Sequence, residues 1–160
     1  MATLYSDQIT IARAAAAGTS YSLVSGTDTI GAKERINFFS ILTTGSASGD
    51  VLQLTKVPKG ARILGGSLIT EALGSSVTLS LGTDVALSQG VANTAIAAGA
   101  ANLLAATSHA SAAVTSFAAT YALGAGARCD AGETTISATV GGATPTTAVQ
   151  IQGFVRYVQN

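Results

Sequence analysis

Charge is scarce in this sequence. Lys, Arg, Asp and Glu make up 10% of its 160 residues, whereas an ordinary soluble domain has about 25%. A monomer needs surface charge for solubility, so the shortage indicates that part of the surface faces protein neighbours. Eight basic residues balance eight acidic ones. This neutrality argues against nucleic acid or an anionic membrane as a partner, because both attract an excess of positive charge.

Cysteine and histidine are almost absent as well. Cys129 is the only cysteine, so the chain has no partner for an intramolecular disulfide and no cysteine spacing typical of a zinc site. This usage suits assembly in a reducing cytoplasm. His109 is the only histidine, and the sequence contains no G-x-S-x-G motif. We therefore expect a hydrogen-bonded or surface imidazole, no catalytic site, no metal and no cofactor.

The N-terminal residues carry no targeting pattern, because no basic region precedes an apolar run. A long stretch without Lys, Arg, Asp or Glu follows Asp84 and ends at Arg128. It is long enough to span a bilayer, but polar residues are spread through it and alanine supplies much of its apolar content, which argues against a membrane span. We predict a short helix from about 91 to 104 and a strand near 114–123. The small side chains make this region a candidate subunit interface.

Alternating patterns predict strands elsewhere. Apolar and polar side chains alternate strictly at 76–82 and 134–140 and nearly strictly at 149–157. A further strand is predicted at 36–43, in which Phe38 and Phe39 point to opposite faces. The last strand ends close to the C-terminus, so we expect the first and last strands to be neighbours. Evenly spaced short strands with glycine-rich turns indicate an all-β sandwich with one short helix.

The stretch from Gly49 to Asp84 organises the rest. Before the turn signal V-P-K-G at 57–60, Leu52 and Leu54 fall on one face of a predicted strand, and an extended segment follows at 62–72. The turn reverses the chain, because proline presets φ at the second position and glycine suits the fourth. Both faces of the second segment are apolar, which predicts a strand covered on both sides. The Gly65-Gly66 pair in its middle predicts a bulge or bend.

A resemblance to a known family rests on this stretch. The order K-V-P-K-G-A-R-I-L-G-G, strand, then A-L-G-S-S-V-T-L-S-L-G-T resembles a segment of small structural proteins of tailed bacteriophages, particularly capsid decoration (cement, head-stabilising) proteins. The matching positions are turn and core residues, so no family functional residue is transferred. The resemblance implies an all-β accessory virion protein and favours a jelly-roll topology.

Residues 1–35 show no stable period, and we predict an extended N-terminal arm followed by a single β-sandwich (jelly-roll) domain at 36–160. In an isolated domain such an arm is a frayed terminus, whereas in an assembly it lies across a neighbour, which we favour. The basic residues around Pro58 either dock to an acidic neighbour or keep a hairpin tip soluble, and the weakness of exposed charges favours solubility. The candidate capsid contacts are Leu4, Tyr5, Ile9, Ile11, Tyr21, Leu23, Lys56, Lys59 and Arg62.

The functional hypothesis is a capsid decoration protein. It would bind the major capsid protein on the outer surface of the virion as a homotrimer, after assembly in the host cytoplasm, and stabilise the shell without any chemistry of its own. A minor tail or head-completion protein is one alternative. A carbohydrate-binding or adhesin module is another, although the chain has no Trp and only four Tyr to form a sugar platform.

Overall fold

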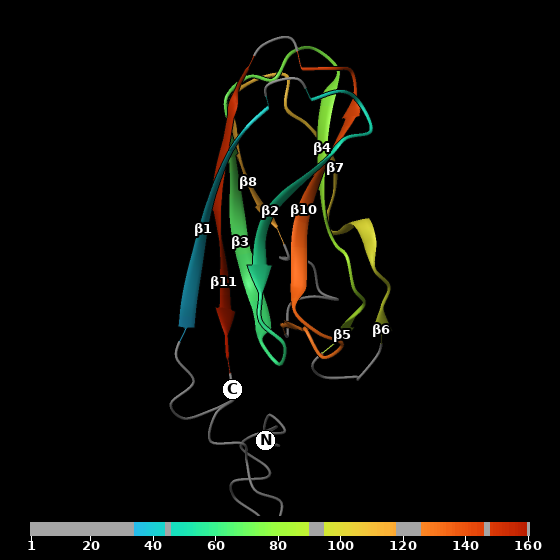
Figure 1. Ribbon diagram of the computed structural model, residues 1–160. Coiled ribbons are helices and arrows are strands. Elements are labelled where there is room, and N and C mark those ends of the chain that lie inside the picture. Colours follow the sequence, from blue (N-terminus) through green and yellow to red (C-terminus); the bar gives the residue numbers. More distant parts are fainter. Residues whose placement is uncertain (1–33, 44–45, 90–94, 118–125, 146–147, 160) are drawn as a thin grey trace, which may run out of the picture.

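Two β-sheets pack face to face in the computed structural model, which describes residues 34–43, 46–89, 95–117, 126–145 and 148–159 (Figure 1). All strand pairings in these residues are antiparallel. The all-β class predicted from the sequence is confirmed. The strands are β1 (Glu34–Leu42), β2 (Val51–Val57), β3 (Arg62–Thr70), β4 (Val77–Thr83), β5 (Leu87–Gln89), β6 (Ala95–Ile96), β7 (Gly99–Ser108), β8 (Ala113–Phe117), β9 (Ala127–Arg128), β10 (Thr134–Gly142) and β11 (Gln150–Val158).

The strand order is that of a jelly roll. One sheet has the order β2-β10-β4-β7, and the other begins β1-β11-β3 and continues through β8 and through β9, β5 and β6. Consecutive strands β1, β2, β3 and β4 alternate between the two sheets, so the chain winds around the core instead of forming simple hairpins. β1 and β11 pair along their whole length, with Glu34 opposite Val158. The prediction that the first and last strands are neighbours is confirmed.

The turn at Pro58 connects the two sheets. β2 and β3, on either side of it, belong to different sheets, so the turn is a crossover and not the tip of a hairpin. Gly60 adopts φ +82°, a left-handed conformation that glycine accepts without strain. Its N–H donates to the carbonyl of Cys129 at 2.9 Å, and the N–H of Ala61 donates to the carbonyl of Pro58 at 3.2 Å. The turn forms where the sequence predicts it.

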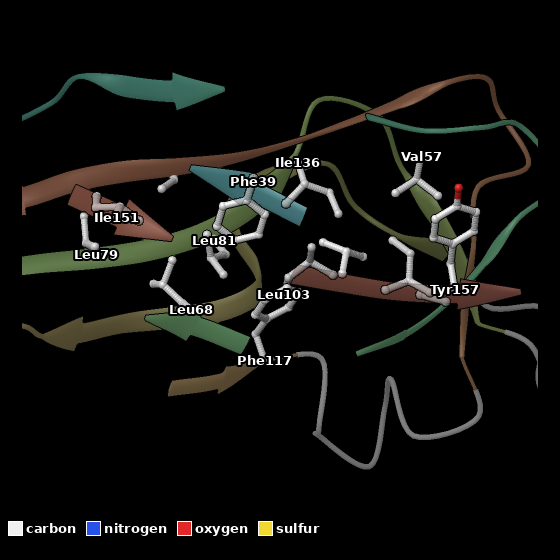
Figure 2. Close-up of a cluster of buried hydrophobic side chains, with 14 of the residues drawn as sticks. Phe39, Val57, Leu68, Leu79, Leu81, Leu103, Phe117, Ile136, Ile151 and Tyr157 are labelled. Atoms are coloured by element: carbon white, nitrogen blue, oxygen red, sulfur yellow. The ribbon is translucent and has the colours of Figure 1, made fainter. Parts of the chain in front are cut away.

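The core lies between the sheets and consists of the inward-facing residues of alternating strands (Figure 2). Along β10, buried residues alternate with half-exposed ones over nearly the whole strand, as a period of two requires. The same alternation holds in β11. The predicted inward faces of β4, β10 and β11 are buried, namely Val77, Leu79, Leu81, Ile136, Ala138, Val140, Val149, Ile151, Val155 and Tyr157.

Strand β3 contains a bulge beside the predicted glycine pair. Its register against β11 skips Leu64, so that Ile63 and Leu68 both point into the core with no exposed surface. Strict alternation would place these two residues on opposite faces of the strand. The extra residue of the bulge shifts the alternation by one, so that both point to the same face. The prediction that both faces are covered is wrong for this strand, because Leu64 is 39% and Ile69 41% exposed.

The prediction of a helix at about 91–104 is also wrong for those residues of the range that the structure describes. Residues 95–96 and 99–104 belong to β6 and β7, and 91–94 lie outside the described residues. Alanine favours a helix by only a few tenths of a kcal/mol per residue over ordinary residues, whereas β7 gains a ladder along β4. Gly82 permits this approach, since an added Cβ there would lie 1.7 Å from the carbonyl oxygen of Gly99. The strand predicted at 114–123 forms as β8, and 118–123 lie outside the described residues.

Candidate docking surfaces

The apolar residues predicted as capsid contacts in the N-terminal arm lie outside the described residues, and their role stays a prediction. These are Leu4, Tyr5, Ile9, Ile11, Tyr21 and Leu23. The three basic candidates are described, and all lie at one end of the sandwich, around the turn between β2 and β3 (Figure 1).

Glu133 neutralises part of this basic end. The ammonium of Lys56 lies 2.7 Å from the Glu133 carboxylate, and both side chains are exposed. The hydrogen bond and the charge of Glu133 raise the pKa of Lys56. The aliphatic stem of Arg62 occupies the space where a Cβ on Gly126 would lie, 2.3 Å from its Cγ, and the side chain is half-buried. Of the three residues, Lys59 at the turn is left as an exposed cation without an ion pair among the described residues.

Acidic residues also lie at this end. β9 pairs with the start of β3, which brings Arg128 and Asp130 close to the basic residues. Asp130 forms an ion pair with Arg128 at 3.4 Å and accepts a hydrogen bond from Ser88. The end is therefore mixed in charge. This arrangement is typical of a solvated surface that contacts a neighbour through individual ion pairs, and it is less typical of a strongly positive docking patch.

The most apolar surface lies on the outside of the sheet that contains β1. We call the outward-facing residues of β1, β11, β3 and β8 the apolar outer face. Of the seven large hydrophobic side chains exposed among the described residues, all except Val51 lie on it. Phe38 is 77% and Val114 71% exposed. The exposed members are Ile36, Phe38 and Leu42 on β1, Leu64 and Ile69 on β3, and Val114 on β8.

The cross-strand register gathers these side chains into rows. One row runs from Phe38 through Phe154 to Ser67 and Ser116. The rings of Phe38 and Phe154 lie 6.2 Å apart between centroids, tilted by 59°, which is within the range of favourable aromatic contacts. The next row contains Ser40, Gln152, Ile69 and Val114. All side chains in these two rows are uncharged.

Two hollows lie on either side of Phe154 on this face. The larger, about 500 Å³, is lined by Phe38, Ser40, Ile69 and Gln152 among others. The smaller, about 270 Å³, lies over the bulge of β3, beside Leu64 and Arg156. The face therefore combines projecting aromatic and aliphatic side chains with adjacent hollows.

A third hollow, about 430 Å³, lies on the outside of the other sheet, next to the start of β7. Its polar lining includes Gln53, Asp84 and a row of hydroxyls from Thr135, Ser137 and Thr139. The Asp84 carboxylate accepts a hydrogen bond from the backbone N–H of Thr135 at 2.8 Å. This hollow offers hydrogen-bond donors and acceptors from amide, hydroxyl and carboxylate groups.

His109 is buried inside the sandwich and has no exposed surface. Its Nδ1 lies 2.8 Å from the Thr70 hydroxyl, and its Nε2 lies 3.1 Å from that of Thr107. Thr107 in turn donates to the carbonyl of Leu79 at 3.4 Å. This chain of donors is consistent with a neutral imidazole protonated on Nε2. Burial lowers the pKa of His109. The two hydroxyl contacts confirm the expectation of a hydrogen-bonded imidazole.

Cys129 is also fully buried. Burial raises the pKa of its thiol, against an opposing hydrogen bond from Thr134, so the reactive thiolate is disfavoured. In the part of the chain that the structure describes, no three His, Cys, Asp or Glu side chains gather into a group that could hold a metal ion. The same residues contain no helix long and apolar enough to cross a bilayer.

The apolar outer face is the feature that sequence reasoning missed. Phe38 and Phe39 were correctly expected on opposite faces, but either could have been the inward one. The available signal was that Ile36, Phe38 and Leu42 share one face of the strand while Phe39 and Ile41 share the other. A strand that is apolar on both faces has either a second covering layer within the chain or a partner outside it.

The fold places the chain in a structural class. Its double sheet is the jelly roll seen in protein chains from phage capsids. A chain from the cyanophage Pam1 capsid superposes with a TM-score of 0.62 at 19% identity, covering 87% of this chain and 94% of that one. A chain from the capsid of Ralstonia phage GP4 superposes with a TM-score of 0.58 at 21% identity, covering 81% of this chain and 87% of that one. A chain from the Helicobacter pylori bacteriophage KHP30 capsid superposes with a TM-score of 0.50 at 17% identity, covering 80% of this chain and 90% of that one.

At these identities the likeness establishes the fold. No protein-family model matches the sequence, and no curated protein matches it significantly. The three capsid chains are covered almost completely, so their whole folded unit and not a fragment corresponds to this one.

Proposed function

We propose that this protein is a decoration protein of a tailed-phage capsid, which binds the outer surface of the shell and stabilises it. The observation that carries the proposal is the jelly-roll fold shared over 94% of a chain from the Pam1 capsid. The resemblance of residues 56–83 to decoration proteins supports it independently, because it rests on the order of residues and not on the fold. The scarcity of charge fits a protein whose surface is partly covered by neighbouring proteins.

The proposed partners are the major capsid protein and two further copies of this chain. Each subunit would contribute a modest contact to the shell. Linking three subunits raises the effective concentration for the later contacts, so that avidity exceeds the affinity of one contact by about 10²–10⁴. The decorated shell then resists the outward pressure of packaged DNA. This role needs no cofactor, nucleic-acid contact or membrane.

We assign the shell contacts to the N-terminal arm and to the basic end of the sandwich. Lys59 is the best placed of the basic residues, because Glu133 already neutralises Lys56 and the stem of Arg62 is packed against Gly126. The strands β1 to β11, which make up both sheets, lie within residues 34–158. Deletion of residues 1–30 should therefore leave a folded β domain that no longer binds shells, and unchanged affinity of the deletion variant would refute the assignment to the arm.

An enzymatic role is not proposed. The only histidine is buried between two threonine hydroxyls, and the only cysteine is buried in the core. Neither is placed to meet a substrate.

The test of the proposal is the copy number of this protein in purified virions, measured by quantitative mass spectrometry against the major capsid protein. A ratio near one, or a simple fraction of it, is the result expected for decoration of the whole shell. A few copies per particle would refute decoration in favour of a minor tail or head-completion protein. Absence from the particle would refute a virion role and favour the adhesin alternative.

A further inference from the structure

The apolar outer face is large enough to be a protein interface. β1, β11 and β3 are nine residues long and β8 is five. At a strand spacing of about 4.8 Å and a rise of about 3.4 Å per residue, they cover on the order of 500 Å² before the relief of the side chains is added. A standard interface buries about 800 Å² on each partner. Side chains as exposed as Phe38 and Val114, at 77% and 71%, leave much of this area apolar. A solvated face of this kind is costly for a monomer.

The charges on the face identify the kind of partner. At one end Glu34 and Arg156 form an ion pair at 3.6 Å, and the two central rows contain no charged residue. A neutral face meets a copy of itself without like-charge repulsion. By contrast, recognition of a charged partner surface would require complementary charges on this face.

The shape of the face leads to the same partner. Phe38 projects from β1, and a hollow of about 500 Å³ lies beside it, lined by Ile69 and Gln152. Every copy carries both features, so in a cyclic trimer the ring of each copy has the hollow of the next copy to enter, a head-to-tail contact that closes after three copies. Aromatic side chains that fill such hollows typically dominate the free energy of association.

The sequence places one edge of this face in the stretch without charge. β8, which carries Val114, lies between Asp84 and Arg128, where no Lys, Arg, Asp or Glu occurs. We propose that the apolar outer face is the surface through which copies of this chain associate, with Phe38 on its β1 edge. This inference rests on the proposed homotrimer and names the surface that builds it.

The test uses the full-length chain and two matched substitutions. Phe38→Glu places a charge at the most exposed large apolar side chain of the face, on its β1 edge, and Val51→Glu places the same charge at a residue 60% exposed on the other sheet. Their masses are measured by light scattering and sedimentation over a range of micromolar concentrations. We expect an oligomer for the wild type and Val51→Glu, and a dissociation constant at least about 30-fold higher for Phe38→Glu, the effect of losing a hot-spot residue.

Circular dichroism and urea unfolding show whether each variant is folded. If Phe38→Glu does not fold, Val114→Glu at the other edge of the face replaces it. Wild-type mass in the folded Phe38→Glu variant, equal dissociation of the Val51→Glu control, or a monomeric wild type would each overturn the inference. An oligomeric Phe38→Glu variant that no longer binds shells would also overturn it and assign the face to the capsid protein. Failure of the proposed function is read separately, from the copy number in virions.

Discussion

The buried histidine predicts how stability depends on pH. His109 has no exposed surface and lies between the hydroxyls of Thr70 and Thr107. Protonation would place a charge in the core and add a second N–H donor, so burial lowers the pKa of the folded state. In the unfolded chain the imidazole titrates near its ordinary pKa of about 6.5. Below this pH the unfolded state therefore binds more protons than the folded state.

The sign and size of the effect follow from this difference in proton binding. Stability contributed by the neutral imidazole is complete above the unfolded-state pKa and is lost as the pH falls below it. One pH unit below that value, at about pH 5.5, the free energy of unfolding should be lower, by at most about 1.4 kcal/mol for a single imidazole.

The assay is urea unfolding at pH 7.5 and 5.5, comparing the wild type with His109→Gln. The variant contains no histidine, because His109 is the only one, so its free energy of unfolding should change much less over this range. The NMR signal of the single imidazole ring provides a direct check, since it should titrate at lower pH in the folded protein than in urea. An equal pH dependence in both proteins, or an ordinary pKa in the folded state, would refute the reasoning.

Two further predictions concern the packing of the core. Gly82→Ala should destabilise the protein by at least about 1–3 kcal/mol in urea unfolding, because the added Cβ would lie 1.7 Å from the Gly99 carbonyl oxygen, between β4 and β7. Gly132→Ala is the matched control, since its Cβ would meet no atom within 4 Å, and its stability should stay within about 0.5 kcal/mol of the wild type; equal losses in the two variants would contradict the packing argument. Cys129 should resist a thiol reagent in the native protein and react once urea has unfolded it, because its side chain is fully buried; rapid modification without urea would show that the thiol is accessible.

Local patterns predicted most of the strands. The alternation in 76–82, 134–140 and 149–157 corresponds to β4, β10 and β11 with the expected inward faces, because side chains of a strand point to alternate sides whatever their partners are. The failures occurred where local preference was weak. The alanine-rich stretch around 99–104 forms part of β7 because pairing with β4 outweighs small differences in helix propensity.

The sites show the same limit. The sequence identified Lys56, Lys59 and Arg62 as a basic cluster, because they are close along the chain. It could not show that Glu133, far away in sequence, neutralises Lys56 at 2.7 Å. The apolar outer face depends on four strands from separate parts of the chain, so no segment by itself displays it.

The sequence by itself determined the all-β class, the position of the Pro58 turn, the inward faces of the clearest strands and the scarcity of charge, histidine and cysteine. These properties follow from backbone geometry over a few residues and from composition. Only the tertiary structure decided which strands pair, that the Pro58 turn crosses between sheets, and which apolar face of β1 and β3 remains exposed. Those outcomes depend on contacts between distant residues, because a strand's hydrogen bonds and its covering layer are supplied by other parts of the chain.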